Sequence, residues 1–217
     1  MKDYGSLIVN LSFREWVGRM TALKIAAAAM VALVLAGCKY ETFSDPQLSG
    51  RDLELMKLAP PMPPVDPMRA RYRITNPTGE KQPGTIVVES NAKFLYLIEE
   101  GGTALRYPIA VGQDHYQWIG EAKVGRKAEW PSWTPGSEAR SLMPGLPATV
   151  PGGAQNPLGA RALYLYDGGK DTLYRIHGTN DPESIGHNVS LGCIRMHNID
   201  AIDLYNRVKE GARVIVR

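Results

Sequence analysis

The chain has 217 residues, of which 44% are hydrophobic and 22% are charged, enough apolar material for one sizeable core but not for two full domains. Its formal net charge is +3. The first 37 residues carry four basic and two acidic side chains and so account for +2 of that charge. The nearly neutral remainder gives no reason to expect a nucleic-acid partner.

The N-terminal part has the layout of an export signal. An apolar run from Ile25 to Leu35 follows basic residues and is too short to span a bilayer as a stable helix. It ends in Leu35-Ala36-Gly37-Cys38, which resembles the lipobox of bacterial lipoproteins. The resemblance implies a signal peptide over residues 1–37, a lipid on Cys38, and a periplasmic protein anchored in a membrane, with Lys39 favouring the outer one. The alternative is an ordinary signal peptide cut near Ala36.

Residues 38–82 are predicted to form an extended tether. The stretch is rich in proline and includes the cluster Pro60-Pro61-Met62-Pro63-Pro64. Proline lacks the backbone donor that helices and sheets require, so a regular element throughout the stretch is excluded. One short helix is predicted inside it, over Arg51–Leu58.

The folded domain is predicted over residues 83–217, and most of it is expected to be β. Runs of β-branched or alternating apolar residues predict a first hairpin or meander and then a second hairpin, which turns at Asp167-Gly168-Gly169-Lys170. A closing strand is predicted at the end of the chain. The predicted strands are Thr85–Val88, Lys93–Ile98, Thr103–Val111, Ala162–Tyr166, Thr172–His177 and Arg213–Val216.

One helix is predicted near the C-terminus. Asn198 is placed to cap its start, and Gly211 lies just beyond its end. Apolar residues recur between them at helical spacing, at Ile199, Ile202, Tyr205 and Val208. The expected fold is therefore a mainly β sandwich or flattened barrel with one helix close to the C-terminus.

A long stretch without predicted elements, Glu129–Pro157, is dense in proline and glycine and contains Trp130 and Trp133. A loop of this length inside a compact domain is usually functional or disordered, and two tryptophans argue against disorder. We expect it to form a wall or lid of a cleft.

Two side chains carry the chemistry. If Cys38 bears lipid, Cys193 is the one thiol that remains, and it has no partner for a disulfide. A thiol accepts an acyl group when a nearby imidazole takes its proton, and His177 ends a predicted strand. Gly192 allows a tight turn before the cysteine, so that the backbone amides of Leu191, Gly192 and Cys193 are predicted to face the oxyanion of a tetrahedral intermediate.

The pattern His177-Gly178 followed by Ser190-Leu191-Gly192-Cys193 resembles the catalytic motif of the YkuD, or ErfK/YbiS-like, family of L,D-transpeptidases. The likeness extends over the domain, to Asn156-Pro157-Leu158-Gly159 and the segment Trp130–Pro135. It implies a YkuD-like β-sandwich or flattened barrel. Leu191 stands where many family members have histidine, which removes a polar contact with the substrate.

The resemblance also implies a role for each matching residue. Cys193 is the nucleophile, His177 the general base, and the carbonyl of Gly178 orients the imidazole. Ser190 supports the site, and Arg195 anchors a carboxylate of the substrate. Trp130 belongs to the substrate cleft.

The implied reaction is a two-step acyl exchange on peptidoglycan stem peptides. Cys193 attacks the carbonyl of the third, diaminopimelate-type residue of a tetrapeptide, expels the terminal D-Ala and forms a thioester. An amine of another stem or of a protein lysine then takes the acyl group. Carbapenem-type β-lactams are expected as covalent inhibitors, and neither a cofactor nor a metal is expected.

Three alternatives stay open on the sequence. Cys193, His177, His187 and His197 offer zinc-ligand chemistry, although their spacing matches no common zinc pattern. The same site would also serve a carboxypeptidase, or an amidase that releases wall proteins. A protein that binds the wall without catalysis would keep the fold alone.

Overall fold

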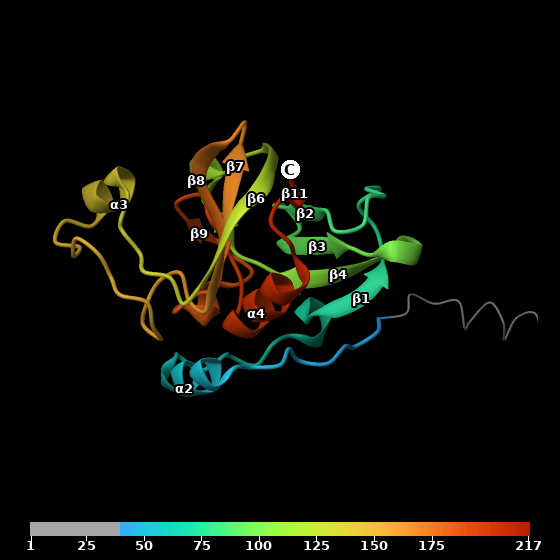
Figure 1. Ribbon diagram of the computed structural model, residues 1–217, viewed down its shortest axis with the longest axis horizontal. Coiled ribbons are helices and arrows are strands. Elements are labelled where there is room, and N and C mark those ends of the chain that lie inside the picture. The colour runs from blue at the N-terminus through green and yellow to red at the C-terminus, as the bar shows by residue number, and fades with distance from the viewer. Residues whose placement is uncertain (1–39) are drawn as a thin grey trace, which may run out of the picture. The chain divides into compact units, whose positions relative to one another are not determined.

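The computed structural model describes residues 40–217, so the predicted signal peptide and Cys38 lie outside the described residues. One mixed sheet of nine strands has the order β1-β4-β3-β2-β11-β6-β7-β8-β10, and β5 pairs with β9 separately (Figure 1). The strands are β1 (Tyr72–Thr75), β2 (Ile86–Glu89), β3 (Phe94–Ile98), β4 (Thr103–Pro108), β5 (Val111–Gly112), β6 (Gly120–Glu129), β7 (Arg161–Asp167), β8 (Lys170–His177), β9 (Asn188–Ser190), β10 (Ile194–Arg195) and β11 (Arg213–Val216).

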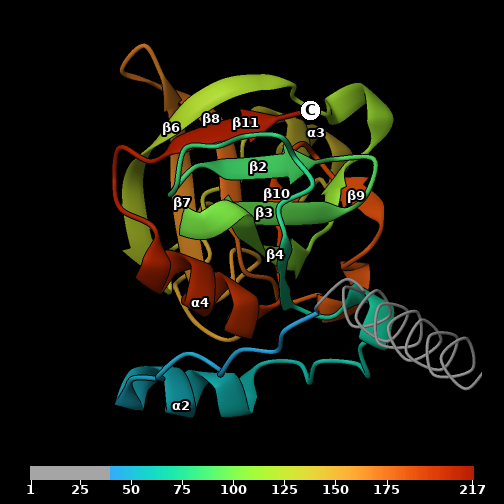
Figure 2. The same cartoon turned by 90° about the vertical axis from the view of Figure 1, so that its right-hand side faces the viewer.

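The described helices are few. They are α2 (Gly50–Leu58), α3 (Ser137–Leu142) and α4 (Asn198–Arg207), with 3-10 turns η1 (Pro67–Arg69), η2 (Glu100–Gly102), η3 (Asp114–Tyr116) and η4 (Pro182–Ser184). Figures 1 and 2 both place α4 between the sheet and α2. Leu55 and Met56 of α2 pack against a cluster that includes Ile202 of α4, which explains this arrangement.

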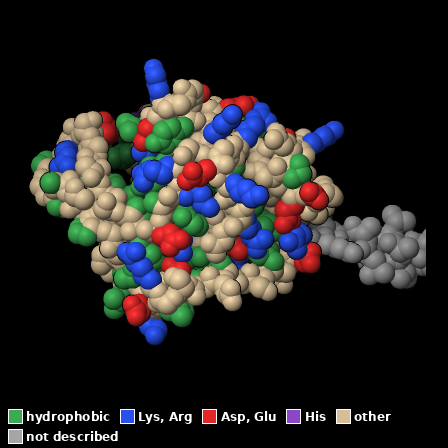
Figure 3. Space-filling view, viewed as in Figure 1, with side chains coloured by type: hydrophobic (Ala, Val, Ile, Leu, Met, Phe, Trp, Pro, Cys, Tyr) green, Lys and Arg blue, Asp and Glu red, His purple; other side chains and the backbone are tan. Residues whose placement is uncertain are grey.

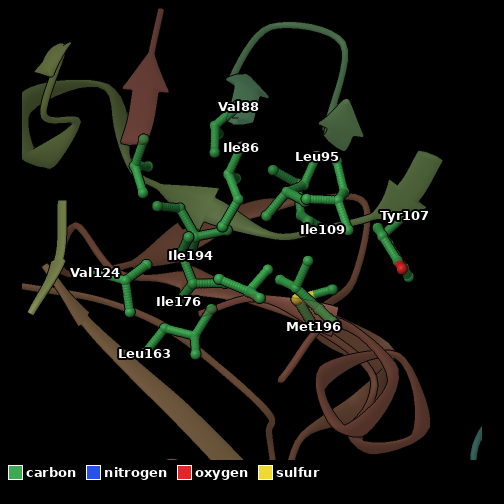
Figure 4. Close-up of a cluster of buried hydrophobic side chains, with 14 of the residues drawn as sticks. Ile86, Val88, Leu95, Tyr107, Ile109, Val124, Leu163, Ile176, Ile194 and Met196 are labelled. Atoms are coloured by element: carbon green, nitrogen blue, oxygen red, sulfur yellow. The ribbon is translucent and has the colours of Figure 1, made fainter. Parts of the chain in front are cut away.

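The main core lies where the two halves of the sheet face each other. Apolar side chains of β2, β3 and β4 point toward those of β6, β7, β8 and β10 (Figure 4). Leu163, Ile176 and Ile194 contribute from the second half and are almost fully buried. The domain is therefore mainly β, as predicted, with the core held between two faces of one bent sheet.

The predicted hairpins are confirmed. β2, β3 and β4 pair antiparallel in sequence order, and so do β7 and β8. β11 closes the sheet between β2 and β6. The helix α4 is also confirmed, but its predicted cap is wrong: His197 is the N-cap residue. The side chain of Asn198 instead accepts from the backbone N–H groups of Ala160 and Thr179.

Strand β6, the longest strand described, was not predicted from the sequence. Charged residues occupy much of it, and the fully buried positions in its first half are Ala122 and Val124. Such a strand lacks the dense apolar signal of its neighbours. It forms because β7 and β11 flank it on both sides.

The prediction of an extended tether over residues 38–82 is wrong for its described part, residues 40–82. The predicted short helix is present as α2, and β1 adds a strand to the edge of the sheet through β4. Asp52 of α2 is 1% exposed and pairs with Arg161 of β7. Ion pairing and strand addition thus fasten the proline-rich stretch to the domain, and residues 40–217 form one unit.

Candidate active site

The strand pair β8–β10 brings the predicted nucleophile and base together. The two strands run parallel, with Ile194 opposite Ile176 and Arg195 opposite His177. Ile176 and Ile194 point into the core, so by alternation His177, Arg195 and Cys193 belong to the opposite face. Cys193 and His177 therefore lie on one face of adjoining strands, as the predicted chemistry requires.

The imidazole of His177 is buried and neutral. Its Nδ1 donates to the carbonyl oxygen of Gly178 at 2.5 Å, which leaves Nε2 free of a proton. Burial, together with the nearby charge of Arg195, lowers the pKa of His177 to about 3. The ring is thus held in the tautomer and charge state that a general base needs, and the predicted orienting role of Gly178 agrees with this contact.

The thiol of Cys193 opens onto a pocket. Burial raises the pKa of Cys193, against the opposing effects of a backbone hydrogen bond at Arg175 and the charges of Arg175 and Arg195. Its Sγ contacts the carbonyl oxygen of Leu173 at 3.9 Å, and among the described residues no hydrogen bond joins it to His177. The resting pair is consequently a neutral thiol beside a neutral imidazole. Proton transfer requires the thiol to turn toward Nε2 or a water to bridge the two.

A tight turn positions Cys193. The hydroxyl of Ser190 donates to the carbonyl oxygen of Cys193 at 2.6 Å and accepts from the backbone N–H of Gly192 at 3.1 Å. Gly192 has φ 114°, and a Cβ there would stand 2.6 Å from the ring of Tyr174, so a side chain is excluded. Ser190 supports the site as predicted. The amide of Gly192 is therefore bound to Ser190, and the predicted oxyanion roles of Leu191, Gly192 and Cys193 stay predictions.

The pocket in front of Cys193 has a volume of about 810 Å³. One wall comes from β6, β7 and β8, and Leu191 and Cys193 lie at its edge. The opposite wall comes from the loop between β6 and β7, including Trp133 and residues of α3. Figure 3 shows the surface hollowed between the lobe that carries α3 and the body of the domain. The prediction that the loop forms a cleft wall is confirmed.

The base of this loop is pinned by hydrogen bonds. The backbones of Trp133 and Val150 exchange two hydrogen bonds of 2.9 and 2.8 Å. The amide of Asn156 donates to the carbonyl oxygens of Val150 and Pro151. These contacts hold the lobe that contains α3 as a hairpin-like projection over the pocket.

Two predicted site residues, Trp130 and Arg195, are not among those that line this pocket. The indole of Trp130 is 3% exposed and donates to Asp52 at 2.8 Å, so its predicted place in the substrate cleft is wrong. Arg195 lies opposite His177 and pairs with Asp181 at 3.4 Å, outside the residues that line the pocket. Its charge helps to lower the pKa of His177, and its predicted role in anchoring a carboxylate of the substrate stays a prediction.

The structure adds three residues to the site. Arg126 of β6, Tyr164 of β7 and Arg175 of β8 line the pocket side by side. The guanidinium carbons of Arg126 and Arg175 lie 3.4 and 4.4 Å from the centre of the Tyr164 ring. Alternation back from His177 places Arg175 on this face already in the sequence, whereas Arg126 requires knowledge of the strand pairing.

The zinc alternative finds no support in the site geometry. Within residues 40–217, no group of three or more His, Cys, Asp or Glu side chains is placed to hold a metal ion. His187 is exposed and His197 is buried. Within the same residues, no helix has both the length and the apolar character needed to cross a bilayer.

A thiol at the edge of a pocket, with a buried neutral imidazole on the next strand, is an arrangement of cysteine-dependent acyl-transfer sites. The model of the YkuD family, described as the L,D-transpeptidase catalytic domain, matches residues 83–216. This chain belongs to that family, and the match begins where the sequence predicts the folded domain to start.

Several individual proteins are similar to this chain. The probable L,D-transpeptidase YbiS of Escherichia coli K12 is 40% identical over 138 residues, which cover 59% of this chain and 43% of the relative. This chain therefore spans less than half of the length of that curated relative. A solved structure from Brucella melitensis, described as a probable carnitine operon oxidoreductase, is 44% identical and covers 67% of this chain and 91% of its own, with a TM-score of 0.48. L,D-transpeptidase 3 from Mycobacterium tuberculosis, in complex with a faropenem-derived adduct, is 18% identical and covers 69% of this chain and 68% of its own, with a TM-score of 0.49.

Proposed function

We propose that the chain is an L,D-transpeptidase that acts on peptidoglycan stem peptides through a thioester on Cys193. The observation that supports it best is the parallel pairing of β8 with β10, which puts Cys193, at the edge of a pocket, on the strand next to that of His177. Family membership supports the reaction class.

In the first step, Sγ of Cys193 bonds to the carbonyl carbon of the third residue of a tetrapeptide, and the thiol proton passes to Nε2 of His177. The tetrahedral intermediate then breaks its bond to the terminal D-Ala, whose nitrogen takes the proton from His177. The thioester remains. Because the resting pair is neutral, proton transfer accompanies the attack instead of preceding it.

In the second step, an amine of another stem peptide or of a protein lysine attacks the thioester carbonyl. His177 takes a proton from the attacking amine and returns it to the departing thiolate. The product is an amide, and the free thiol is restored. Water in place of the amine would give hydrolysis, which is the carboxypeptidase alternative.

The nucleophile is tested by Cys193→Ala. We expect this variant to fold as the wild type does and to release no D-Ala from a stem tetrapeptide. A carbapenem adds to the thiol as its lactam ring opens, so wild-type protein should gain the full mass of the drug, since no group leaves. Equal adducts on both proteins in mass spectrometry would contradict the assignment of Cys193.

The acceptor is tested separately. Wild-type protein is incubated with purified muropeptides, and the products are separated by chromatography and identified by mass. Cross-links between third residues support the transpeptidase. Tripeptides alone, with free amines present, would instead favour the carboxypeptidase.

We also propose that the protein is exported and anchored through lipid on Cys38, most readily in the outer membrane. The support is the sequence of the lipobox-like segment before Cys38. Radiolabelled palmitate should enter the wild-type protein and not Cys38→Ala. Loss of membrane association in that variant would separate this model from a plain signal peptide.

A further inference from the structure

One cation in the pocket of Cys193 has no role in the reaction steps. Arg126 is exposed, and its guanidinium lies over the ring of Tyr164 at 3.4 Å from the ring centre. Among the described side chains, no carboxylate forms an ion pair with it. Arg175, on the other side of Tyr164 in the sheet, is neutralised by two hydrogen bonds of 2.7 and 2.9 Å to Asp171. Asp171 also interacts electrostatically with Arg126, and Glu138 of α3 lines the opposite wall. On the sheet side of the pocket, the two arginines therefore exceed the charge of Asp171 by one.

A β-bulge aims Arg126 into the pocket. On β6, Val124 lies opposite Leu165 and faces the core, yet Arg126 lies opposite Tyr164, on the pocket face. In a regular strand, residues two apart share a face, so the irregularity at Gly125 reverses the direction of Arg126. A Cβ at Gly125 would stand 2.4 Å from the ring of Tyr166, so the bulge depends on glycine here. Bulges that redirect a side chain are frequent beside active sites.

The geometry also limits which ligand group reaches Arg126. Cys193 lies at the start of β10, and β8 and β7 separate β10 from β6. Three steps between neighbouring strands amount to about 14 Å between the two backbones. A carboxylate in the residue next to the attacked carbonyl is only about 4 Å away along the chain. The guanidinium of Arg126 lies nearer to β10 than its backbone does, over the ring of Tyr164 on β7. The side-chain carboxylate of a diaminopimelate-type residue extends farther from the attacked carbonyl than the carboxylate of the released D-Ala does, and so reaches this guanidinium more readily.

We infer that Arg126 binds a free carboxylate on the retained part of the donor stem peptide and so sets which donors the enzyme accepts. Two groups fit the chemistry: the side-chain carboxylate of the diaminopimelate-type third residue and the carboxylate of the second residue. The planar guanidinium, which lies over the ring of Tyr164, has N–H donors in the paired geometry that a carboxylate accepts. This inference rests on the proposed function, because it takes the stem peptide as the substrate.

The test measures binding apart from turnover. Three tetrapeptides are titrated calorimetrically into Cys193→Ala: the parent, its third-residue amide and its second-residue amide. The same titrations are repeated with Arg126→Gln, Arg126→Lys or Lys123→Gln added. Lys123 is the matched control, since it is exposed, lies on the same strand and lines a different pocket.

We expect one of the two amides to bind Cys193→Ala about tenfold or more weaker than the parent peptide. Arg126→Gln should weaken binding of the parent peptide by a similar factor, and the parent and that amide should then bind with equal affinity. Arg126→Lys should give an intermediate loss, because it keeps the charge and loses the planar fork. Lys123→Gln should leave all three affinities within about twofold.

Equal affinities of the parent and both amides, or equal losses for all three in Arg126→Gln, would overturn the role of Arg126. Failure of the parent to bind Cys193→Ala would do the same. Release of D-Ala by wild-type protein is measured in parallel. If wild-type protein releases D-Ala but Arg126→Gln does not change the affinity difference between the parent and either amide, the inference fails and the proposed function stands. If wild-type protein releases no D-Ala, the proposed function itself fails.

Discussion

The ion pair between α2 and β7 should dominate the attachment of the proline-rich segment. Asp52 accepts two hydrogen bonds of 2.8 Å from Arg161 and one of 2.8 Å from Trp130. Ser49 completes its capping box. Asp52→Asn removes the charge with little change in shape, and leaves Arg161, which is 4% exposed, without its buried partner.

Removal of one member of a buried ion pair costs about 3 to 5 kcal/mol. Glu129 lies 3.8 Å from Arg161 but is half exposed, so it offsets only part of the loss. We therefore expect Asp52→Asn to lower the free energy of unfolding by about 3 kcal/mol. Urea unfolding at pH 7 followed by tryptophan fluorescence measures this, with Glu54→Gln on the exposed side of α2 as the control.

The pH dependence gives a second check on the same pair. Burial by itself raises the pKa of Asp52, but hydrogen bonds from Arg161, Ser49 and Trp130 outweigh it and hold that pKa below its ordinary value. A carboxyl whose folded-state pKa is depressed stabilises the fold above its unfolded pKa and loses that effect as the pH falls through the folded pKa. The difference in unfolding free energy between wild type and Asp52→Asn should thus become smaller below about pH 4. A difference under about 0.5 kcal/mol at pH 7 would refute the reasoning.

Two further predictions concern the site. Gly192→Ala should lower the free energy of unfolding by more than about 1 kcal/mol and slow acylation of Cys193, because φ is 114° and the new Cβ meets Tyr174. Urea unfolding measures the loss of stability, and mass spectrometry of β-lactam adducts measures acylation. Equal effects from Gly50→Ala, where a Cβ would meet open space, would contradict this prediction. Since the pKa of His177 is lowered to about 3, the base stays neutral well below pH 6.5, so the acylation rate should show no acidic midpoint near pH 6.5. A stopped-flow profile that falls severalfold between pH 7.5 and 5.5 would argue against a buried neutral base.

Sequence patterns located the turn that carries Cys193 because its determinants are local. Cys193, Ser190 and Gly192 form one turn, and the alternation around Ile176 and Ile194 decides which side chains leave the core. The mistakes arose where a residue had a distant partner. The sequence predicts Trp130 in the substrate cleft, but its indole N–H donates to the carboxylate of Asp52, 78 positions away in the chain.

From the sequence alone, the mainly β character, the hairpins and α4 were determined, because hydrophobic periodicity and turn chemistry act over a few residues. Cys193 and His177 were indicated by the resemblance of their motifs to the YkuD family. Tertiary structure alone decided that residues 40–82 pack on the domain, that β6 forms between β11 and β7, and that Arg126 enters the pocket. Each of these depends on long-range strand pairing or on burial of a charge against a remote partner. Neither strand pairing nor a buried ion pair produces a periodic pattern in the sequence, since the stabilising contacts come from residues that only the folded protein brings together.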